Sequence, residues 1–142
     1  MRRIFNTNYN HQSLDFALLL LRIGIAAFML THGLSKINPV LSGAPIQFGD
    51  PLGLGEKLSF FLTVFAEVGC SVLLLFGLAT RLAVIPLIVT MVVAIFIIHA
   101  PDAFEKKELA WHYLIVYIFL LFSGAGRYSV DALIGKKPGR RR

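Results

Sequence analysis

Residues 58–78 read LSFFLTVFAEVGCSVLLLFGL, an apolar stretch of 21 residues with a single charged side chain, Glu67. A helix needs about 20 apolar residues to cross the hydrocarbon core of a bilayer. Three more stretches of similar character occur in the chain, at residues 14–37, 82–99 and 109–125. Together the four stretches predict an all-α fold, an integral membrane bundle of four antiparallel helices.

The composition also indicates a membrane protein. Hydrophobic residues make up 56% of the 142 residues and charged residues 15%, whereas ordinary globular chains carry about 25% charged residues. The mean hydropathy is +0.72. Little sequence remains outside the apolar stretches, so we expect residues 1–142 to form a single transmembrane domain. The one cysteine, Cys70, excludes an internal disulfide or a C-x-x-C relay.

The distribution of lysine and arginine predicts how the helices are oriented, because cytoplasmic ends carry the excess of positive charge. Nine basic residues fall on one side, namely Arg2, Arg3, Arg81, Arg127, Lys136, Lys137, Arg140, Arg141 and Arg142. Four fall on the other side, namely Lys36, Lys57, Lys106 and Lys107. We therefore expect both termini in the cytoplasm. The basic tail, residues 136–142, fits this asymmetry better than it fits a nucleic-acid patch, and whether the tail is native stays open.

Two charges lie deep inside apolar stretches, where an unpaired charge costs at least ~2.5–3.5 kcal/mol on insertion scales. At 1.5 Å per residue, Arg22 is about 12 Å from the start of its helix, and Glu67 is close to the midplane. We expect these two side chains to form a buried ion pair. The alternative is that Arg22 extends to the inner membrane interface.

Several polar side chains are expected near the outer ends of the helices. They are His32, Lys36, Glu67, His99, Trp111 and His112. We expect them to converge beneath the loop of residues 38–57, which is too rich in proline and glycine for a helix, and to form a pocket for a small ligand such as a quinone headgroup. The alternative is that the histidines bind backbone or lipid headgroups separately. Their spacing matches no known metal motif, so no metal site is predicted.

Two smaller expectations concern the end of the chain. Tyr113, Tyr117 and Tyr128 suit the aromatic belts of a membrane interface. Arg127 and Asp131 are four residues apart and are expected to pair at the cytoplasmic exit of the last helix.

Three short motifs resemble the DoxX family. They are Arg22-Ile23-Gly24 followed by HGLSK at residues 32–36, Glu67-Val68-Gly69 followed by LFGLATRLA at residues 75–83, and GAGRYSVD at residues 124–131. The resemblance spans roughly residues 14–133. It implies a small bacterial inner-membrane protein of four helices with a redox association, since the family is named after a subunit linked to quinone-dependent sulfur oxidation. The family pattern marks Arg22, His32, Lys36, Glu67, Arg81, Arg127 and Asp131.

Two function classes follow. The first is an accessory subunit of a quinone-linked redox system, whose electrons come from a membrane-bound or peripheral partner because the chain has no flavin, haem-attachment or iron–sulfur signature. The second is a non-catalytic membrane assembly factor of the chaperone type. A transporter is a weaker third, since 142 residues supply half a pathway unless the chain forms a homo-oligomer. A stand-alone enzyme is not expected, and the sequence identifies no catalytic residue.

Overall fold

The computed structural model describes residues 10–135, and within this range the chain is helical and contains no strand. The elements, in chain order, are α1 (His11–Leu41), α2 (Glu56–Val64), η1 (Phe65–Cys70), α3 (Ser71–Phe76), α4 (Thr80–Val93), η2 (Ala94–Ile98), α5 (Phe104–Ser123) and α6 (Val130–Ile134). The all-α prediction is confirmed for these residues. Arg2, Arg3 and the basic tail at 136–142 lie outside the described residues.

Three helical stretches are long and apolar enough to cross a membrane: His11–Leu41, Glu56–Phe76 and Thr80–Ile98. The second runs through α2, η1 and α3 without a break, and the third runs through α4 and η2. Four such helices were expected. α5 has 20 residues, but its first turns hold two glutamates and two lysines between residues 105 and 108, so its apolar part is shorter.

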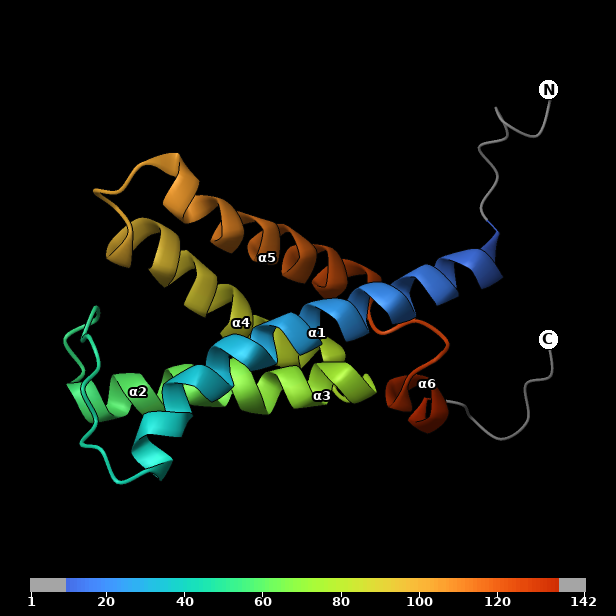
Figure 1. Cartoon of the computed structure of the whole chain (residues 1–142). Coiled ribbons are helices and arrows are strands. Elements are labelled where there is room, and N and C mark those ends of the chain that lie inside the picture. Colours follow the sequence, from blue (N-terminus) through green and yellow to red (C-terminus); the bar gives the residue numbers. More distant parts are fainter. Residues whose placement is uncertain (1–9, 136–142) are drawn as a thin grey trace.

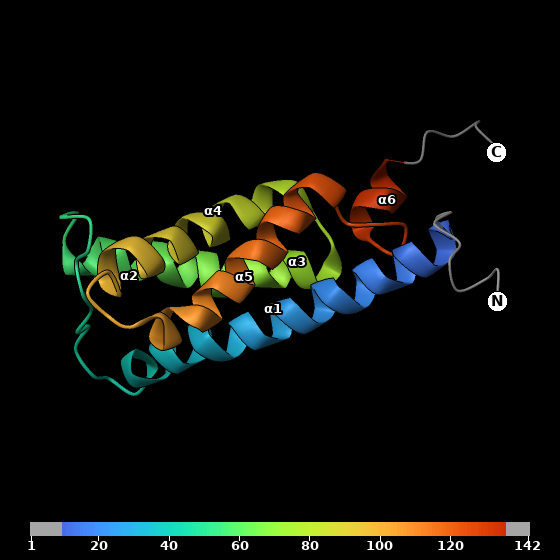
Figure 2. The same ribbon diagram turned by 90° about the horizontal axis from the view of Figure 1, so that it is seen from above.

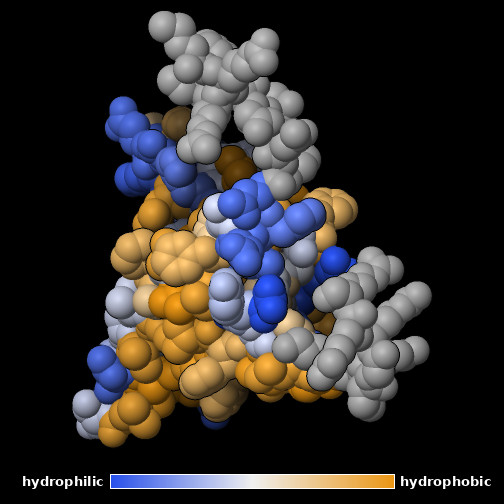
Figure 3. All heavy atoms as spheres, turned by 90° about the vertical axis from the view of Figure 1, so that its right-hand side faces the viewer, coloured by the Kyte–Doolittle hydropathy of each residue, from blue (hydrophilic) through white to orange (hydrophobic). Residues whose placement is uncertain are grey.

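The ends of these helices gather at two poles (Figures 1 and 2). The start of α1, the turn between α3 and α4, and α6 lie toward one pole, which we call the arginine pole. The loop of residues 42–55, the start of α2 and the connection from η2 to α5 lie at the other, which we call the glutamate pole. α5 packs mainly on α4, and α1 packs mainly on α3. Seen end-on at the arginine pole, one group of hydrophilic side chains lies near the middle of the face beside a broad hydrophobic area, and further hydrophilic groups lie at the left edge of the view (Figure 3).

The first helix extends further than expected. Asn10 caps its start, because the Asn10 side chain accepts hydrogen bonds from the backbone N–H groups of Gln12 and Ser13 at 3.0 and 3.4 Å. At its other end Pro39, which was expected in a loop, lies in the last turns of α1. The carbonyl of Pro39 is satisfied by the N–H of Ala44 at 3.0 Å, so the irregular loop begins by closing the helix end.

α1 and η1 approach most closely at Gly33, which is buried in α1. A Cβ placed on Gly33 would lie 2.5 Å from Cγ2 of Val68 and 3.1 Å from Cβ of Glu67. Small residues allow membrane helices to pack this closely. Gly33 therefore fixes which part of α1 faces Glu67.

We predict that Gly33→Ala destabilises the protein by about 1–3 kcal/mol, because the added methyl group overpacks the contact with η1. Thermal unfolding in detergent measures the effect. Gly24→Ala is the matched control on the same helix, since a Cβ on Gly24 meets no atom within 4 Å. We expect Gly24→Ala to be neutral or stabilising by up to about 1 kcal/mol, because alanine is the better helix former. An equal loss of stability in Gly33→Ala and Gly24→Ala would contradict the close packing at Gly33.

Candidate functional site

The candidate site is built on an ion pair between Lys36 of α1 and Glu67 of η1. The Lys36 ammonium contacts Oε1 of Glu67 directly. The Glu67 side chain is only 4% exposed and that of Lys36 is 33% exposed, so the pair lies at the edge of the interior with its carboxylate inside. The second carboxylate oxygen, Oε2, is buried and accepts no hydrogen bond from any described residue.

Two cavities meet at this ion pair. The larger, about 560 Å³, lies between the α2–η1 stretch and the α4–η2 stretch and is roofed by the loop that precedes α2. The smaller, about 150 Å³, lies between α1, η2 and α5. Both have Lys36, Glu67 and His99 on their walls. The rest of the larger cavity is lined mainly by apolar side chains, among them Phe65, Ile85 and Val89 from the facing helices.

Two of the predicted histidines belong to this site. His32 is on the wall of the smaller cavity, and its ring meets the edge of the Tyr113 ring with centroids 5.9 Å apart. His99 follows η2 and donates from Nδ1 to Asp102 at 2.8 Å. That hydrogen bond holds the pKa of the Asp102 carboxyl below its ordinary value. Asp102 thereby orients His99 at the mouth of both cavities.

The other two predicted pocket residues do not join the site. Trp111 packs edge-on against Phe96, with ring centroids 5.8 Å apart, and lines neither cavity. His112 is exposed, and its Nδ1 lies 2.7 Å from the carbonyl oxygen of Glu108 in the previous turn of the same helix. Neither residue therefore contributes to the cavity walls that hold Glu67.

The expected ion pair between Arg22 and Glu67 does not form. Arg22 is 1% exposed, and its guanidinium donates to the carbonyl oxygens of Ala125 and Tyr128 at 2.6 and 2.8 Å. The reason is the register of α1. Because Gly33 faces Glu67, Arg22 lies eleven residues earlier, roughly 16 Å along the helix, and reaches the arginine pole instead.

At the arginine pole the family motifs close the bundle. Gly77 ends α3 with φ at +67°, and a Cβ there would collide with the Arg22 guanidinium and with Cβ of Ser129 at 2.6 Å. Glycine is therefore required both for its left-handed backbone and for space. The motif at residues 75–83 and the motif at 124–131 meet at this one contact.

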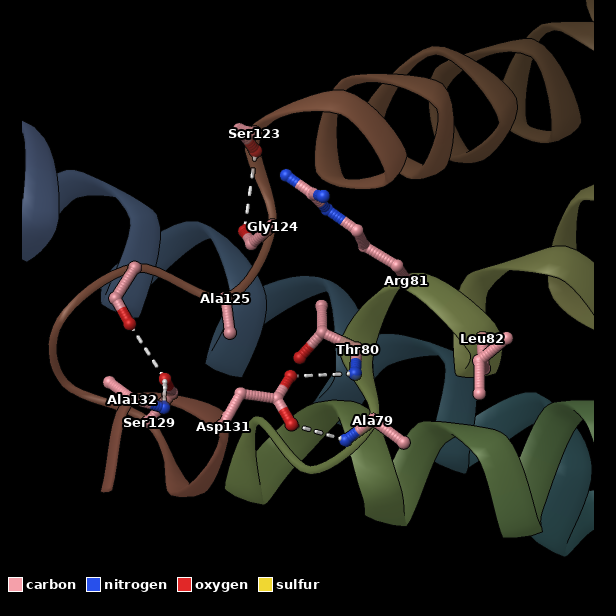
Figure 4. A pocket seen from close by; sticks show the side chains of 11 residues that line it. Ala79, Thr80, Arg81, Leu82, Ser123, Gly124, Ala125, Ser129, Asp131 and Ala132 are labelled. Atoms are coloured by element: carbon pink, nitrogen blue, oxygen red, sulfur yellow. Dashed lines mark hydrogen bonds between the residues drawn. The ribbon is translucent and has the colours of Figure 1, made fainter. Parts of the chain in front are cut away.

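The sequence suggested that Asp131 pairs with Arg127, and the structure does not show this pair. Its two carboxylate oxygens accept the backbone N–H groups of Ala79 and Thr80 at 2.7 and 2.9 Å, so Asp131 caps the start of α4 (Figure 4). Arg127 instead donates its backbone N–H to Asp15 of α1 at 2.9 Å. The two residues are at one end of the bundle, but the Asp131 carboxylate binds backbone N–H groups and Arg127 is bound through its backbone N–H.

The hollow of about 390 Å³ at this pole is shallow, and its charged groups are already engaged. Arg81 extends from the start of α4 toward Ser123 and Gly124 (Figure 4), and it donates to the carbonyl oxygen of Phe122 at 3.1 Å. Asp131 is held by two backbone N–H groups. We therefore assign Arg22, Arg81 and Asp131 to the structure of the protein and place the candidate site at the glutamate pole.

Sequence reasoning misplaced two tyrosines. Tyr113 and Tyr117 were expected in an interfacial belt, but they are 5% and 0% exposed and stack on each other with centroids 6.0 Å apart. The hydroxyl of Tyr117 is buried without a hydrogen-bond partner among the described residues. The helical spacing could have indicated their burial, because both tyrosines share one face of α5 with the buried Leu120.

Both long helices that enclose the larger cavity change pitch beside it. Glu67 lies in the π-helical turn η1, and Ala94 and Ile98 of the cavity wall belong to the π-helical turn η2. Such turns insert an extra residue and rotate the helix face that follows, and they occur frequently at functional sites. Here they lie on both sides of one cavity.

The roof of the larger cavity is organised by Asp50. Its carboxylate accepts hydrogen bonds from the N–H groups of Leu54 and Gly55 at 2.8 and 2.7 Å and from the hydroxyl of Ser59 at 2.9 Å. These bonds tie the loop to the first turn of α2. Phe48 and Leu54 of the same loop line the cavity, so Asp50 positions the roof.

Among residues 10–135 no three side chains of histidine, cysteine, aspartate or glutamate cluster closely enough to hold a metal ion. The chemistry that the site offers is hydrogen bonding and charge: an ammonium, a carboxylate and an imidazole at the end of an apolar cavity.

Comparison with known proteins settles the family. The sequence model of the DoxX family matches residues 17–100 of the chain. The chain belongs to the DoxX family. The match includes the motifs around Arg22, His32 and Glu67, and it covers Lys36 and His99 of the glutamate-pole site as well.

Relatives of this DoxX protein include several bacterial proteins. A Bacillus subtilis protein named "Putative oxidoreductase CatD" is 29% identical over 132 residues, which cover 91% of this chain and 96% of the relative. An uncharacterised membrane protein of Mycobacterium tuberculosis is 29% identical over 140 residues, or 82% and 80% of the two chains. An uncharacterised protein of Haemophilus influenzae is 32% identical over 133 residues, or 86% and 93%. No solved structure matches with comparable significance.

We predict that Arg22→Met destabilises the protein by roughly 3–5 kcal/mol, because it leaves two buried carbonyl oxygens without their charged donor. Arg81→Met is the matched control at the same pole, since Arg81 is exposed and makes one 3.1 Å bond, and it should cost about 0.5 kcal/mol. Thermal unfolding in detergent compares the two. In the double variant Arg22→Met/Glu67→Gln, the two losses of unfolding free energy should add to within about 0.5 kcal/mol. A larger deviation from additivity would support the Arg22–Glu67 ion pair that the structure does not show.

We predict that the roof loop loosens in acid. The N–H of Gly55, helped by Ser59 and Leu54, lowers the pKa of the Asp50 carboxyl when the loop is folded. Asp50 therefore stabilises the folded loop fully above the ordinary aspartate pKa, and this contribution is lost as the pH falls through the lowered value. Amide hydrogen exchange at Leu54 and Gly55, corrected for intrinsic rates, should speed up in that window. In Asp50→Asn the same amides should show no such pH dependence. If the exchange rates of the wild type do not change with pH in this window, Asp50 does not organise the loop.

Proposed function

We propose that this DoxX protein binds a quinone at the glutamate pole and serves as an accessory subunit of a quinone-linked redox system. The observation that supports this most strongly is the larger cavity. It is mainly apolar, about 560 Å³ in volume, and has the Lys36–Glu67 ion pair on its wall. Pockets for small organic ligands have about 300–1,000 Å³ and combine apolar walls with a few polar groups.

The polar groups suit a quinone ring. Lys36 has three N–H donors and uses one on Glu67, so it has donors left for a ring oxygen. His99 lies on the same wall. Between these groups and the far end of the cavity, Phe65, Ile85 and Val89 provide apolar surface for the ring and its tail. Phe65 and Val89 are 56% and 52% exposed, so the cavity borders the surface that would face lipid.

The redox part of the proposal has a separate basis. The Bacillus relative is named as an oxidoreductase and aligns over nearly its whole length. Because this chain has a single cysteine and no flavin or haem-attachment motif, we propose that the electrons come from a partner, either a membrane protein or a peripheral one. A bound quinone would then be the electron acceptor that this subunit positions.

The proposal includes a membrane arrangement. We propose that α5 is a fourth span beside the three long apolar helices, that residues 1–142 form one domain of four antiparallel helices, and that this domain lies in the bacterial inner membrane. The excess of arginine and lysine that the sequence predicts on the side of the two chain ends favours that side, and with it both termini, in the cytoplasm. The glutamate pole would then face the outer side of the membrane.

Binding of a decyl-benzoquinone to the protein in lipid nanodiscs tests the proposal. We expect saturable binding by the wild type and at least tenfold weaker binding by the double variant Lys36→Met/Glu67→Leu. Removing both charges avoids the larger penalty of stranding one of them, so this variant should remain folded. His112→Ala is the control, because His112 is exposed and lines neither cavity. No quinone binding, together with stable association with unrelated membrane proteins, would favour the assembly-factor alternative.

A further inference from the structure

The glutamate pole contains a hydrogen-bond acceptor that no described residue satisfies. Glu67 is 3% exposed, and only its Oε1 has a partner, the ammonium of Lys36. Oε2 is buried and accepts nothing from residues 10–135. A buried polar atom without a partner is rare in folded proteins and calls for an explanation. A ligand that carries a donor would supply one.

We infer that this site selects the reduced, hydroxyl-bearing form of its ligand, a quinol, over the quinone. The inference rests on the proposed function and names the redox form that the site prefers. A carboxylate paired with an ammonium only accepts hydrogen bonds. A quinone ring offers carbonyl acceptors and no donor. It would therefore leave Oε2 of Glu67 unsatisfied and set a second acceptor beside it.

A quinol hydroxyl fits both members of the ion pair. It donates its hydrogen to a carboxylate oxygen of Glu67, and its oxygen accepts from an N–H of Lys36, since a hydroxyl is both a donor and an acceptor. The two groups are adjacent, because Lys36 contacts Glu67 directly. Both are on the wall of the larger cavity together with its apolar surface. A single ring hydroxyl at this position would give Oε2 of Glu67 its missing donor and would use a second N–H of Lys36.

Other donors near the pair do not fill this role. Lys106 and His99 lie on the smaller cavity with Glu67, but both of them contact Asp102, at 3.5 and 2.8 Å. Tyr113 is on the same wall, but its hydroxyl does not donate to Oε2 of Glu67, which has no partner among the described residues. Tyr117 has a free hydroxyl but lines neither cavity. Tyr117→Phe is therefore a suitable control for the loss of a neighbouring hydroxyl.

A preference for the reduced form has a measurable consequence. Reduction adds two electrons and two protons to the quinone, and tighter binding of the product favours that reduction. For this two-electron couple, a tenfold preference raises the midpoint potential of the bound quinone by about 30 mV relative to the free quinone. In a titration the electrons come from a redox mediator and the protons from the buffer.

The test measures two matched probe pairs on the full-length protein in nanodiscs. The first is decyl-benzoquinol, kept reduced under anaerobic conditions, against decyl-benzoquinone. The second cannot exchange electrons: an alkyl phenol against its methyl ether, which lacks the donor. We expect the wild type to bind the quinol and the phenol at least tenfold more tightly than their partners. Tyr117→Phe should keep this preference.

Glu67→Gln should remove or reverse the preference, because its amide supplies N–H donors that suit a quinone carbonyl. The thermal unfolding of this variant is measured alongside. If the variant does not fold, the binding of the two probe pairs by the wild type still tests the inference. Equal binding of both members of each pair by the wild type would overturn this inference while leaving the proposed function intact. A preference that survives Glu67→Gln but is lost in Tyr117→Phe would overturn the assignment to Glu67. Failure of all four probes to bind would overturn the proposed function as well.

Discussion

A carboxylate buried in an apolar helix needs a cation beside it, and the position of that cation decides how the first helix packs in this protein. Glu67 is nearly inaccessible, and an isolated charge there would be costly. Lys36, near the end of α1, places its ammonium against one oxygen of this carboxylate. One turn earlier, Gly33 lets α1 approach η1 closely enough for this contact. The pairing and the close packing therefore set the same register.

That register determines what happens at the opposite pole. With Lys36 beside Glu67, Arg22 lies about 21 Å away along α1, at 1.5 Å per residue, and meets the loop after α5. A loop buried against helices exposes carbonyl oxygens that have no helical partner. Arg22 supplies two donors to them, and Asp131 supplies the acceptor that the start of α4 needs. The charged residues of this pole thus replace hydrogen bonds that the backbone cannot make within helices.

The sequence predicts the helical elements well because long apolar stretches have few alternatives to a helix. The residues that make up the site are also largely predictable: His32, Lys36, Glu67 and His99 do come together. Their partners are not predictable, since charge patterns do not show the register between two helices, and Lys36 and Arg22 are both plausible cations for Glu67. Backbone acceptors such as the carbonyl of Ala125 leave no trace in the sequence. The prediction that Tyr117 belongs to an interfacial belt was wrong, because Tyr117 lies on the buried face of α5.

The two poles differ in whether a charged side chain with an unpartnered buried atom lines a cavity, and this difference is the reason we propose the glutamate pole as the functional site. At the arginine pole each carboxylate oxygen of Asp131 accepts a backbone N–H, and Arg81 and Arg22 donate to backbone carbonyls. The Nε of Arg22 is buried without a partner among the described residues, but Arg22 lines none of the cavities described above. At the glutamate pole one carboxylate oxygen of Glu67 has no donor among residues 10–135. Glu67 lines a cavity, and the helices that enclose this cavity depart from α-helical pitch there. If stability were the only requirement, a hydrogen-bond donor for that oxygen, or an apolar residue in place of Glu67, would be favoured. A buried charge that is left half-satisfied beside an open apolar space is better explained by a ligand than by stability.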